Sequence, residues 1–332
     1  MNDNPTCPVC SNQSWDNRGH RTYHRADRQR GARPYRNAME VLFDVWAPGQ
    51  DAFRVEFIAC RNCGFLTYSP RPTADDIARK YRHTPSDSAQ DAPAATAALS
   101  RQDVRRARRL TRLILGETKA KSTRGLRVLD FGGGDGRMLG GLVDRGALCH
   151  LVDYSERVHP GVTKIGDTEH DIPADANYDV IICSHVVEHL PDPRETLAAL
   201  RDALAPDGII YVEVPIEVVG QLPAAHEPVT HLNFFTPDSL RALLAFAGYG
   251  VNWSRLVAEP HPWGYKQLCA GAVATPAAIA PEDVPVSGLD FLEPYLDGAY
   301  AVRAKRRWVL GLEKPDMLRK GLRKLPILWR YS

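Results

Sequence analysis

The sequence has 332 residues, of which 42 are Lys or Arg and 40 are Asp or Glu, so its formal net charge is +2. This length gives room for about two domains, and a hydrophobic content of 44% can fill a sizeable core. The small net charge excludes a strongly cationic nucleic-acid coat, and no apolar run reaches the roughly 18 residues of a membrane span. The first residues lack the basic start and apolar stretch of a signal peptide, so we expect a cytoplasmic protein.

Two cysteine pairs lie near the two ends of the first 82 residues. The stretch CPVC runs from Cys7 to Cys10, and CRNC runs from Cys60 to Cys63. A gap of two residues lets two thiolates of one turn reach the same tetrahedral ion. Seven cysteines without secretory features favour metal binding or reduced thiols over a disulfide framework. We predict that residues 1–82 are a small, loop-rich zinc-binding module with one structural Zn²⁺ on all four cysteines; two independent thiol pairs are the alternative.

Residues 83–100 are rich in alanine and polar side chains and predict a linker, because they offer little apolar surface for a core. From residue 101 to about residue 277, apolar strand-like runs alternate with helical patterns, which is typical of a parallel sheet covered by helices. The predicted strands are 126–131, 148–152, 162–165, 178–183, 209–214, 249–257 and 267–273. The predicted helices begin near residue 101 and cover 136–146, 193–204 and 236–247. We therefore expect an α/β, doubly wound, seven-stranded domain over residues 101–277.

A glycine-rich turn follows the first of these strands. The stretch VLDFGGGDG places Gly132, Gly134 and Gly136 at every second position after Asp130. Glycines let the backbone turn sharply and approach a ligand closely, and the helix that follows offers free N–H groups at its start. Asp153 ends the next strand, 21 residues after Gly132, where a carboxylate can accept both hydroxyls of a ribose. The spacing does not fit the nicotinamide fingerprint G-x-G-x-x-G. A turn that serves only the core is the alternative.

The pattern D-x-G-x-G-x-G resembles motif I of the class I S-adenosylmethionine-dependent methyltransferases. The stretch YDVIICSHVVEHLPDP at 178–193 and the turn PDG at 206–208 resemble the family's fourth strand and the turn before its fifth. The resemblance implies a Rossmann-like methyltransferase fold that binds S-adenosylmethionine. It places the glycines at the methionine portion, the acidic residue after the second strand at the ribose, and an aspartate after the third strand at the adenine. The implied cofactor-binding residues are Asp130, Gly132, Gly134, Gly136, Asp153, Ser184 and either Asp167 or Asp171.

The stretch CRNCGFLTYSPRP at residues 60–72 resembles the zinc-ribbon head of one branch of these methyltransferases. That branch includes deoxysugar C-methyltransferases and enzymes of glycan clusters, so the resemblance implies a sugar or glycan acceptor. Sugar C-methyltransferases carry a further large domain, whereas about 55 residues follow the transferase region here. Both oxygen and carbon therefore stay open as the methylated atom.

A polar and aromatic stretch, AAHEPVTHLNFF, follows the fifth strand at residues 224–235. Parallel sheets of α/β proteins bind ligands beyond the carboxyl ends of their strands, and histidine suits proton transfer at neutral pH. The stretch resembles the branch's His-Glu-His-Leu segment, with the His-Leu pair displaced. We predict His231 as the general base, with His226 as the alternative and Glu227 as an orienting partner. If neither histidine serves, the remaining candidates are Glu188, His189 and His185.

The last residues, 278–332, form a basic tail. From Ala301 onward the sequence has ten Lys or Arg and two acidic residues, a local charge of about +8. Trp and Leu side chains are mixed with these charges, which predicts short helical pieces. They either dock on an anionic membrane surface at the inner membrane face or pack back on the transferase domain.

We predict that the protein transfers a methyl group from S-adenosylmethionine to an oxygen or carbon of a sugar, glycan or related small molecule. Two alternatives come from other classes: a zinc-containing, RNA-binding or RNA-modifying methyltransferase, and a non-catalytic cofactor-binding scaffold. A net charge of +2 and the lack of a recognisable RNA-binding pattern make a nucleic-acid partner the weaker hypothesis. The oligomeric state is left open.

Overall fold

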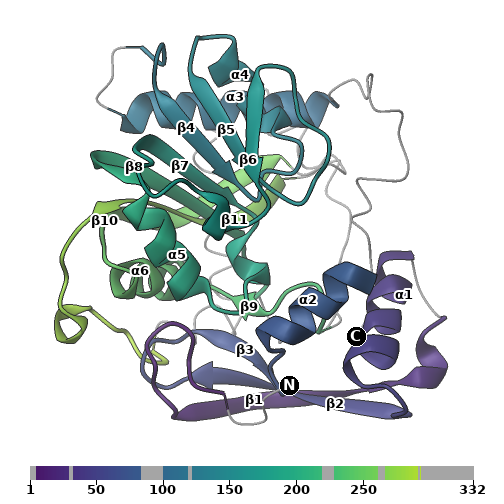
Figure 1. The fold of residues 1–332 in the computed structure, drawn as a ribbon. Coiled ribbons are helices and arrows are strands. Elements are labelled where there is room, and N and C mark those ends of the chain that lie inside the picture. Colours follow the sequence, from purple (N-terminus) through teal and green to yellow (C-terminus); the bar gives the residue numbers. More distant parts are fainter. Residues whose placement is uncertain are drawn as a thin grey trace, which may run out of the picture.

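The computed structural model describes residues 5–29, 33–83, 100–118, 122–218, 228–260, 266–290 and 292. These residues form two β-sheets, and the larger sheet with its helices lies above the smaller one in Figure 1. Most of the predicted linker and most of the predicted basic tail lie outside the described residues.

The larger sheet has seven strands in the order β10-β11-β8-β7-β4-β5-β6. Its strands are β4 (Arg127–Phe131), β5 (Leu148–Val152), β6 (Val162–Gly166), β7 (Tyr178–Ser184), β8 (Leu204–Pro215), β10 (Tyr249–Pro260) and β11 (Lys266–Pro276). Neighbours from β6 to β8 pair in parallel, whereas β11 is antiparallel to both β8 and β10. All seven predicted strands are present, and the α/β fold class is confirmed.

Helices cover both faces of this sheet. The helices are α3 (Arg101–Glu117), α4 (Gly140–Val143), α5 (Pro193–Asp202) and α6 (Pro237–Phe246). Because side chains alternate along a strand, Val128 and Val180 pack with α3 and α4, while Leu129 and Ile181 pack with α5 and α6. The buried strands therefore read as nearly continuous apolar runs, which is why sequence patterning locates them.

Two of the helix starts follow local capping chemistry, and one predicted helix is much shorter than expected. The Ser100 hydroxyl accepts the Asp103 N–H at 3.1 Å, and Thr236 caps α6 with proline next to it. The helix predicted at 136–146 is a 3₁₀ turn at Arg137–Leu139 followed by the single turn of α4. Glycines are poor helix formers, and Gly141 approaches α3 so closely that an added Cβ would lie 2.6 Å from Thr111 Oγ1.

The N-terminal part is not loop-rich, so that prediction is wrong. Its sheet has the order β1-β2-β3-β9, and its elements are β1 (Trp15–His24), α1 (Arg33–Glu40), β2 (Ala52–Cys60), β3 (Leu66–Ser69), α2 (Ala74–His83) and the two-residue strand β9 (Asn233–Phe234). A π-helical segment, Val41–Trp46, continues α1 and buries Leu42, Phe43 and Trp46. Only Tyr23 of β1 is buried, so this strand carries little alternation of apolar and polar residues in the sequence.

A short strand, an aromatic contact and hydrogen bonds of one arginine connect the two sheets. Strand β9 follows β8 of the larger sheet in the chain, yet it pairs with β3 through Leu66 and Phe234. The rings of Phe65 and Phe235 lie 5.2 Å apart beside this pairing. The guanidinium of Arg71 donates to the carbonyls of Pro191 at 2.7 Å and Leu232 at 3.3 Å. The N-terminal part therefore shares a continuous hydrophobic core with the larger sheet and its helices.

The first residues of the predicted tail contact the N-terminal sheet. The backbone N–H of Gly288 donates to the Asn62 carbonyl at 3.0 Å, and the Leu292 side chain is buried with Met39 and Leu42. The basic segment from Ala301 lies outside the described residues, so its contact with a membrane stays a prediction. Among the described residues, no helix has the length and apolarity that crossing a bilayer requires.

Candidate active site

The glycine loop joins β4 to the 3₁₀ turn before α4, and its glycines adopt left-handed backbone conformations. Gly132, Gly134 and Gly136 have φ angles of +70°, +65° and +74°. A Cβ on Gly132 would lie 2.5 Å from a methyl group of Val186, so the packing at this position leaves no room for a side chain. A Cβ on Gly134 would meet no atom within 4 Å, so this glycine faces open space.

Asp153, at the end of β5, holds this loop in place. Its Oδ2 accepts the Gly134 N–H at 2.8 Å, and its Oδ1 accepts the Ser155 N–H at 2.8 Å. Burial raises the pKa of Asp153, although both N–H donors act in the opposite direction. The residue predicted to hold the ribose thus contacts Gly134, although neither Asp153 nor Gly136 is among the residues that line the cavity described below.

Asp130, the next-to-last residue of β4, is a buried carboxyl at the base of the loop. Burial raises its pKa to about 7, and the nearby Asp153 charge adds to this effect while Arg106 opposes it. The group therefore changes charge near neutral pH.

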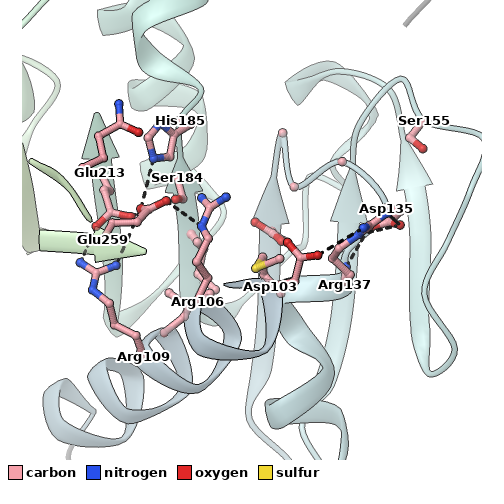
Figure 2. A pocket seen from close by; sticks show the side chains of 18 of the residues that line it. Asp103, Arg106, Arg109, Asp135, Arg137, Ser155, Ser184, His185, Glu213 and Glu259 are labelled. Atoms are coloured by element: carbon pink, nitrogen blue, oxygen red, sulfur yellow. Dashed lines mark hydrogen bonds and ion pairs between the residues drawn. The ribbon is translucent and has the colours of Figure 1, made fainter. Parts of the chain in front are cut away.

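A cavity of about 520 Å³ opens between the glycine loop and α3 (Figure 2). Of the predicted cofactor residues, Asp130, Gly132, Gly134 and Ser184 line it, together with Asp135 and Ser155. Its size falls in the roughly 300 to 1,000 Å³ range of small-molecule sites.

The two candidates for the adenine contact do not line this cavity. The Asp167 carboxylate pairs with Lys164 at 2.6 Å, and the Asp171 carboxylate accepts the N–H groups of Asp167 and Thr168 at 2.9 Å. Asp171 therefore stabilises its own turn after β6. The adenine contact stays a prediction.

The wall opposite the glycine loop is a charged network that the sequence analysis missed. Arg106 Nε lies 2.6 Å from Glu259 Oε1, and Arg109 pairs with Glu213. Figure 2 shows both arginines pointing from α3 toward these two glutamates, which stand on β10 and β8. Ser184 Oγ also donates to Glu213 at 3.2 Å. The available signals were the i, i+3 spacing of two arginines on α3 and the lone acidic residue within the apolar run of β8.

His185 lies at the centre of this network in a left-handed conformation, with a φ of +60°. Its Nε2 lies 3.1 Å from Glu259 Oε2, and its Nδ1 lies 3.4 Å from Glu188 Oε1. Burial alone would lower the pKa of His185, but contacts with Cys269, Glu188 and Glu259 raise it to about 12. A histidine that stays protonated at neutral pH is unsuited to act as a base.

His231, the predicted base, lies beside His189 and Glu188. The rings of His189 and His231 are 4.7 Å apart, and His231 Nδ1 lies 2.7 Å from Glu217 Oε2. Burial lowers the pKa of His189 to about 4, so this ring is neutral at pH 7. None of the three is among the residues that line the cavity. The other two predicted catalytic residues, His226 and Glu227, lie outside the described residues.

The four predicted metal ligands converge. Cys7 Sγ lies 3.7 Å from Cys63 Sγ, and Cys10 Sγ lies 3.6 Å from Cys60 Sγ. All four sulfur atoms lie within 4.8 Å of one another, and none forms a disulfide. Sulfurs bound tetrahedrally to zinc at about 2.3 Å lie about 3.8 Å apart, so the donor set and its spacing fit Zn²⁺.

Comparisons with known proteins concern the transferase part of the chain. Residues 99–252 match the model of a family described as a methyltransferase domain. A ubiquinone biosynthesis O-methyltransferase from Neisseria meningitidis is 31% identical over 103 residues, which cover 26% of this chain and 43% of that protein. A protein of the same name from a Caulobacter species is 32% identical over 146 residues, which cover 36% of this chain and 58% of that protein.

Among solved structures, the 1,6-didemethyltoxoflavin-N1-methyltransferase of Burkholderia thailandensis, with bound 1,6-didemethyltoxoflavin and S-adenosylhomocysteine, is similar at 23% identity and a TM-score of 0.39. That match covers 52% of this chain and 78% of the other. The chain spans about half the length of the curated relatives it matches. Residues 99–252 thus match a methyltransferase-domain family, and the seven-stranded sheet and the glycine loop give this region the Rossmann-like fold that the sequence predicts.

Proposed function

We propose that the chain transfers a methyl group from S-adenosylmethionine to a hydroxyl oxygen or a carbon of a small polar acceptor, with sugars and glycan intermediates as the favoured class. The observation that carries the proposal is the cavity between two different walls. One wall is the glycine loop, where Gly134 is open and Asp153 lies alongside. The other is a wall of charged side chains, which offers many hydrogen-bonding groups.

The glycine-loop wall is assigned to the cofactor. Backbone N–H groups of the loop and the carboxylates of Asp130 and Asp153 would hold it, and Gly134 has room for its close approach. When bound, S-adenosylmethionine supplies a methyl group activated by its positively charged sulfur. The remaining task of the chain is to orient the acceptor and to accept its proton.

The charged wall is assigned to the acceptor. Arg106, Arg109, His185 and Gln267 line the cavity opposite the loop, and the carboxylates of Glu213 and Glu259 neutralise the cations. Such a wall of paired charges matches a hydroxyl-rich, uncharged molecule better than an apolar one. The curated relatives are named O-methyltransferases of ubiquinone biosynthesis, which favours oxygen as the methylated atom.

Proton removal by His231 stays a prediction, because this side chain is not among the residues that line the cavity. Its Nδ1 is held by Glu217, which orients the ring and leaves Nε2 as the basic nitrogen. The four cysteines are assigned a structural Zn²⁺, because a closed set of four thiolates has no position for a substrate.

The test uses the full chain with methyl-labelled S-adenosylmethionine and a panel of acceptors. The panel contains nucleotide sugars, lipid-linked glycans, hydroxylated phenols and short RNAs. Labelled product from a sugar or glycan supports the proposal, and label in RNA would favour the alternative nucleic-acid function. Tight binding of S-adenosylhomocysteine with no labelled product from any acceptor would instead favour the scaffold hypothesis.

A further inference from the structure

Helix α3 carries four exposed arginines on the side that faces away from the sheet. They are Arg101, Arg105, Arg108 and Arg112, which together are called the arginine stripe below. At about 3.6 residues per turn, spacings of four, three and four residues place them within an arc of about 60° and along about 16 Å of the helix. The arginine stripe is therefore a straight row of positive charge.

The side chains of the arginine stripe have no acidic partner in the described part of the chain. Arg105 reaches only the side chain of Gln102, at 3.5 Å, and the other three make no ion pair or hydrogen bond with described residues. The two acids of α3 are used elsewhere, since Asp103 caps the helix and Glu117 accepts the indole N–H of Trp253. Like charges four residues apart destabilise a helix, and an anionic ligand would offset this effect.

Two further arginines of the same helix are neutralised. Arg106 and Arg109 line the cavity and pair with the carboxylates of Glu259 and Glu213 (Figure 2). Arg105 lies four residues before Arg109, so these two side chains are neighbours on the helix surface. The paired charges of the cavity wall thus continue over α3 into the unpaired charges outside it. A chain-like molecule with one end in the cavity would reach the arginine stripe.

The residue types of α3 favour one class of anionic ligand. All six basic residues of this helix are arginines, and a guanidinium binds a carboxylate through two parallel hydrogen bonds. A membrane surface fits less well, because an interfacial helix inserts its apolar face, and here Leu110 and Ile114 of that face are buried against the sheet. Single-stranded nucleic acid also fits less well, because its bases stack on aromatic side chains and α3 has none.

We propose that the arginine stripe binds an acidic glycan chain, whose carboxylates pair with the guanidinium groups while an uncharged sugar of the same chain occupies the cavity. This inference rests on the proposed function, which places a sugar in the cavity, and it adds the class of chain that carries the sugar. The neutralised wall suits the hydroxyls of that sugar, and the unpaired row suits the charges of its neighbours in the chain.

The experiment measures the binding of polygalacturonate, polymannuronate and neutral dextran to the full chain by titration calorimetry at low salt. We expect both acidic polymers to bind, with an affinity that falls as salt rises, and dextran to bind at least tenfold more weakly. Arg105→Gln combined with Arg108→Gln should weaken the binding of the acidic polymers at least tenfold, and glutamine preserves the helix. Arg21→Gln combined with Arg82→Gln, at exposed positions outside α3, removes the same charge and should bind as the parent does.

Binding of S-adenosylhomocysteine serves as the check that each variant is folded. Failure of the parent to bind either acidic polymer, or equal losses in the two double variants, would overturn the inference. Tighter binding of a single-stranded RNA or of phosphatidylglycerol vesicles, lost in the variant without Arg105 and Arg108, would overturn it as well. Because calorimetry needs no methyl transfer, labelled product from a neutral sugar would still support the proposed function after any of these results.

Discussion

The carboxylate of Asp153 accepts the backbone N–H of Gly134 at 2.8 Å, so the acidic residue at the end of β5 holds the loop that follows β4. A second N–H, that of Ser155, donates to the other carboxylate oxygen. One side chain thus orders the loop and, in the proposed function, also accepts the ribose hydroxyls. A substitution that removes the carboxylate therefore affects both the order of the loop and the proposed ribose contact.

Replacing Asp153 with alanine should weaken S-adenosylhomocysteine binding at least tenfold and lower the thermal midpoint by a few degrees. Hydrogen bonds to a charged group contribute about 1.5 to 3 kcal/mol each, and two are lost. Titration calorimetry and thermal unfolding measure the two effects. The exposed Asp175→Ala serves as the control. Parent-like affinity in Asp153→Ala would exclude this residue from the cofactor site.

Replacing Gly134 with alanine should reduce cofactor affinity far more than stability. The left-handed conformation costs a side chain about 1 to 2 kcal/mol, and the new methyl group enters the space assigned to the cofactor. Gly49 is a matched control, because its φ is +79° and a Cβ there also meets nothing within 4 Å. Gly49→Ala should show the same loss of stability with unchanged calorimetric affinity. Equal affinities in the two variants would contradict the placement of the cofactor.

Asp130 should make cofactor affinity depend on pH. Its pKa of about 7 means that the carboxyl is mainly protonated at pH 6 and mainly ionised at pH 8. A positively charged sulfonium prefers the ionised form, so S-adenosylmethionine should bind up to about tenfold more tightly at pH 8 than at pH 6. S-adenosylhomocysteine, which lacks that charge, should show a shallower dependence. In the Asp130→Asn variant, the affinity for S-adenosylmethionine should not change between pH 6 and pH 8. If the variant's affinity depended on pH as the parent's does, another group would be responsible for the effect.

Loss of zinc should destabilise more than the N-terminal part. Cys7, Cys60 and Cys63 share one hydrophobic core with Leu197 and Leu240 of the transferase helices. We expect one zinc per chain in the parent and none in Cys60→Ser, with a lower midpoint for the whole unfolding transition. Elemental analysis and calorimetric unfolding measure both. Cys149→Ala, in β5 and away from the cluster, should keep its zinc. A separate early transition confined to residues 1–82 would show that the parts unfold independently.

Arg71 should be one of the most sensitive positions outside the cavity. It is buried, and its guanidinium reaches Pro191, Leu232 and the Asn233 side chain. Lysine lacks the planar fork, so Arg71→Lys should lose about 2 to 4 kcal/mol of unfolding free energy. Urea denaturation measures the change, with the exposed Arg21→Lys as the control. A loss below about 0.5 kcal/mol would show that solvent replaces these bonds.

The sequence predicts the larger sheet well because each of its strands carries its own local signal. Leu129 and Ile181 belong to apolar runs bounded by turn residues, and the glycine loop is recognisable from three positions. The cysteine pairs are equally local, although their convergence across 49 intervening residues is a property of the fold.

Other features depend on contacts between segments that are distant in the chain. The pairing of β3 with β9 joins residues 66 and 234, and no local pattern marks a two-residue strand. The pairs of Arg106 with Glu259 and Arg109 with Glu213 likewise join a helix to distant strands. Read separately, these residues look like a solvated helix face and isolated acidic positions. Their partners become visible only once the sheet places α3 against β8 and β10.

The position of strand β9 limits how parts of this protein can be exchanged with those of another protein. It is encoded within the transferase part, yet it forms the edge of the N-terminal sheet next to β3. An N-terminal part moved onto a different transferase would present β3 as an open edge, with unpaired backbone groups ready to join another chain. A working chimera therefore has to exchange the cysteine module and the segment 228–236 together, because the boundary of the interchangeable unit does not follow the order of the chain.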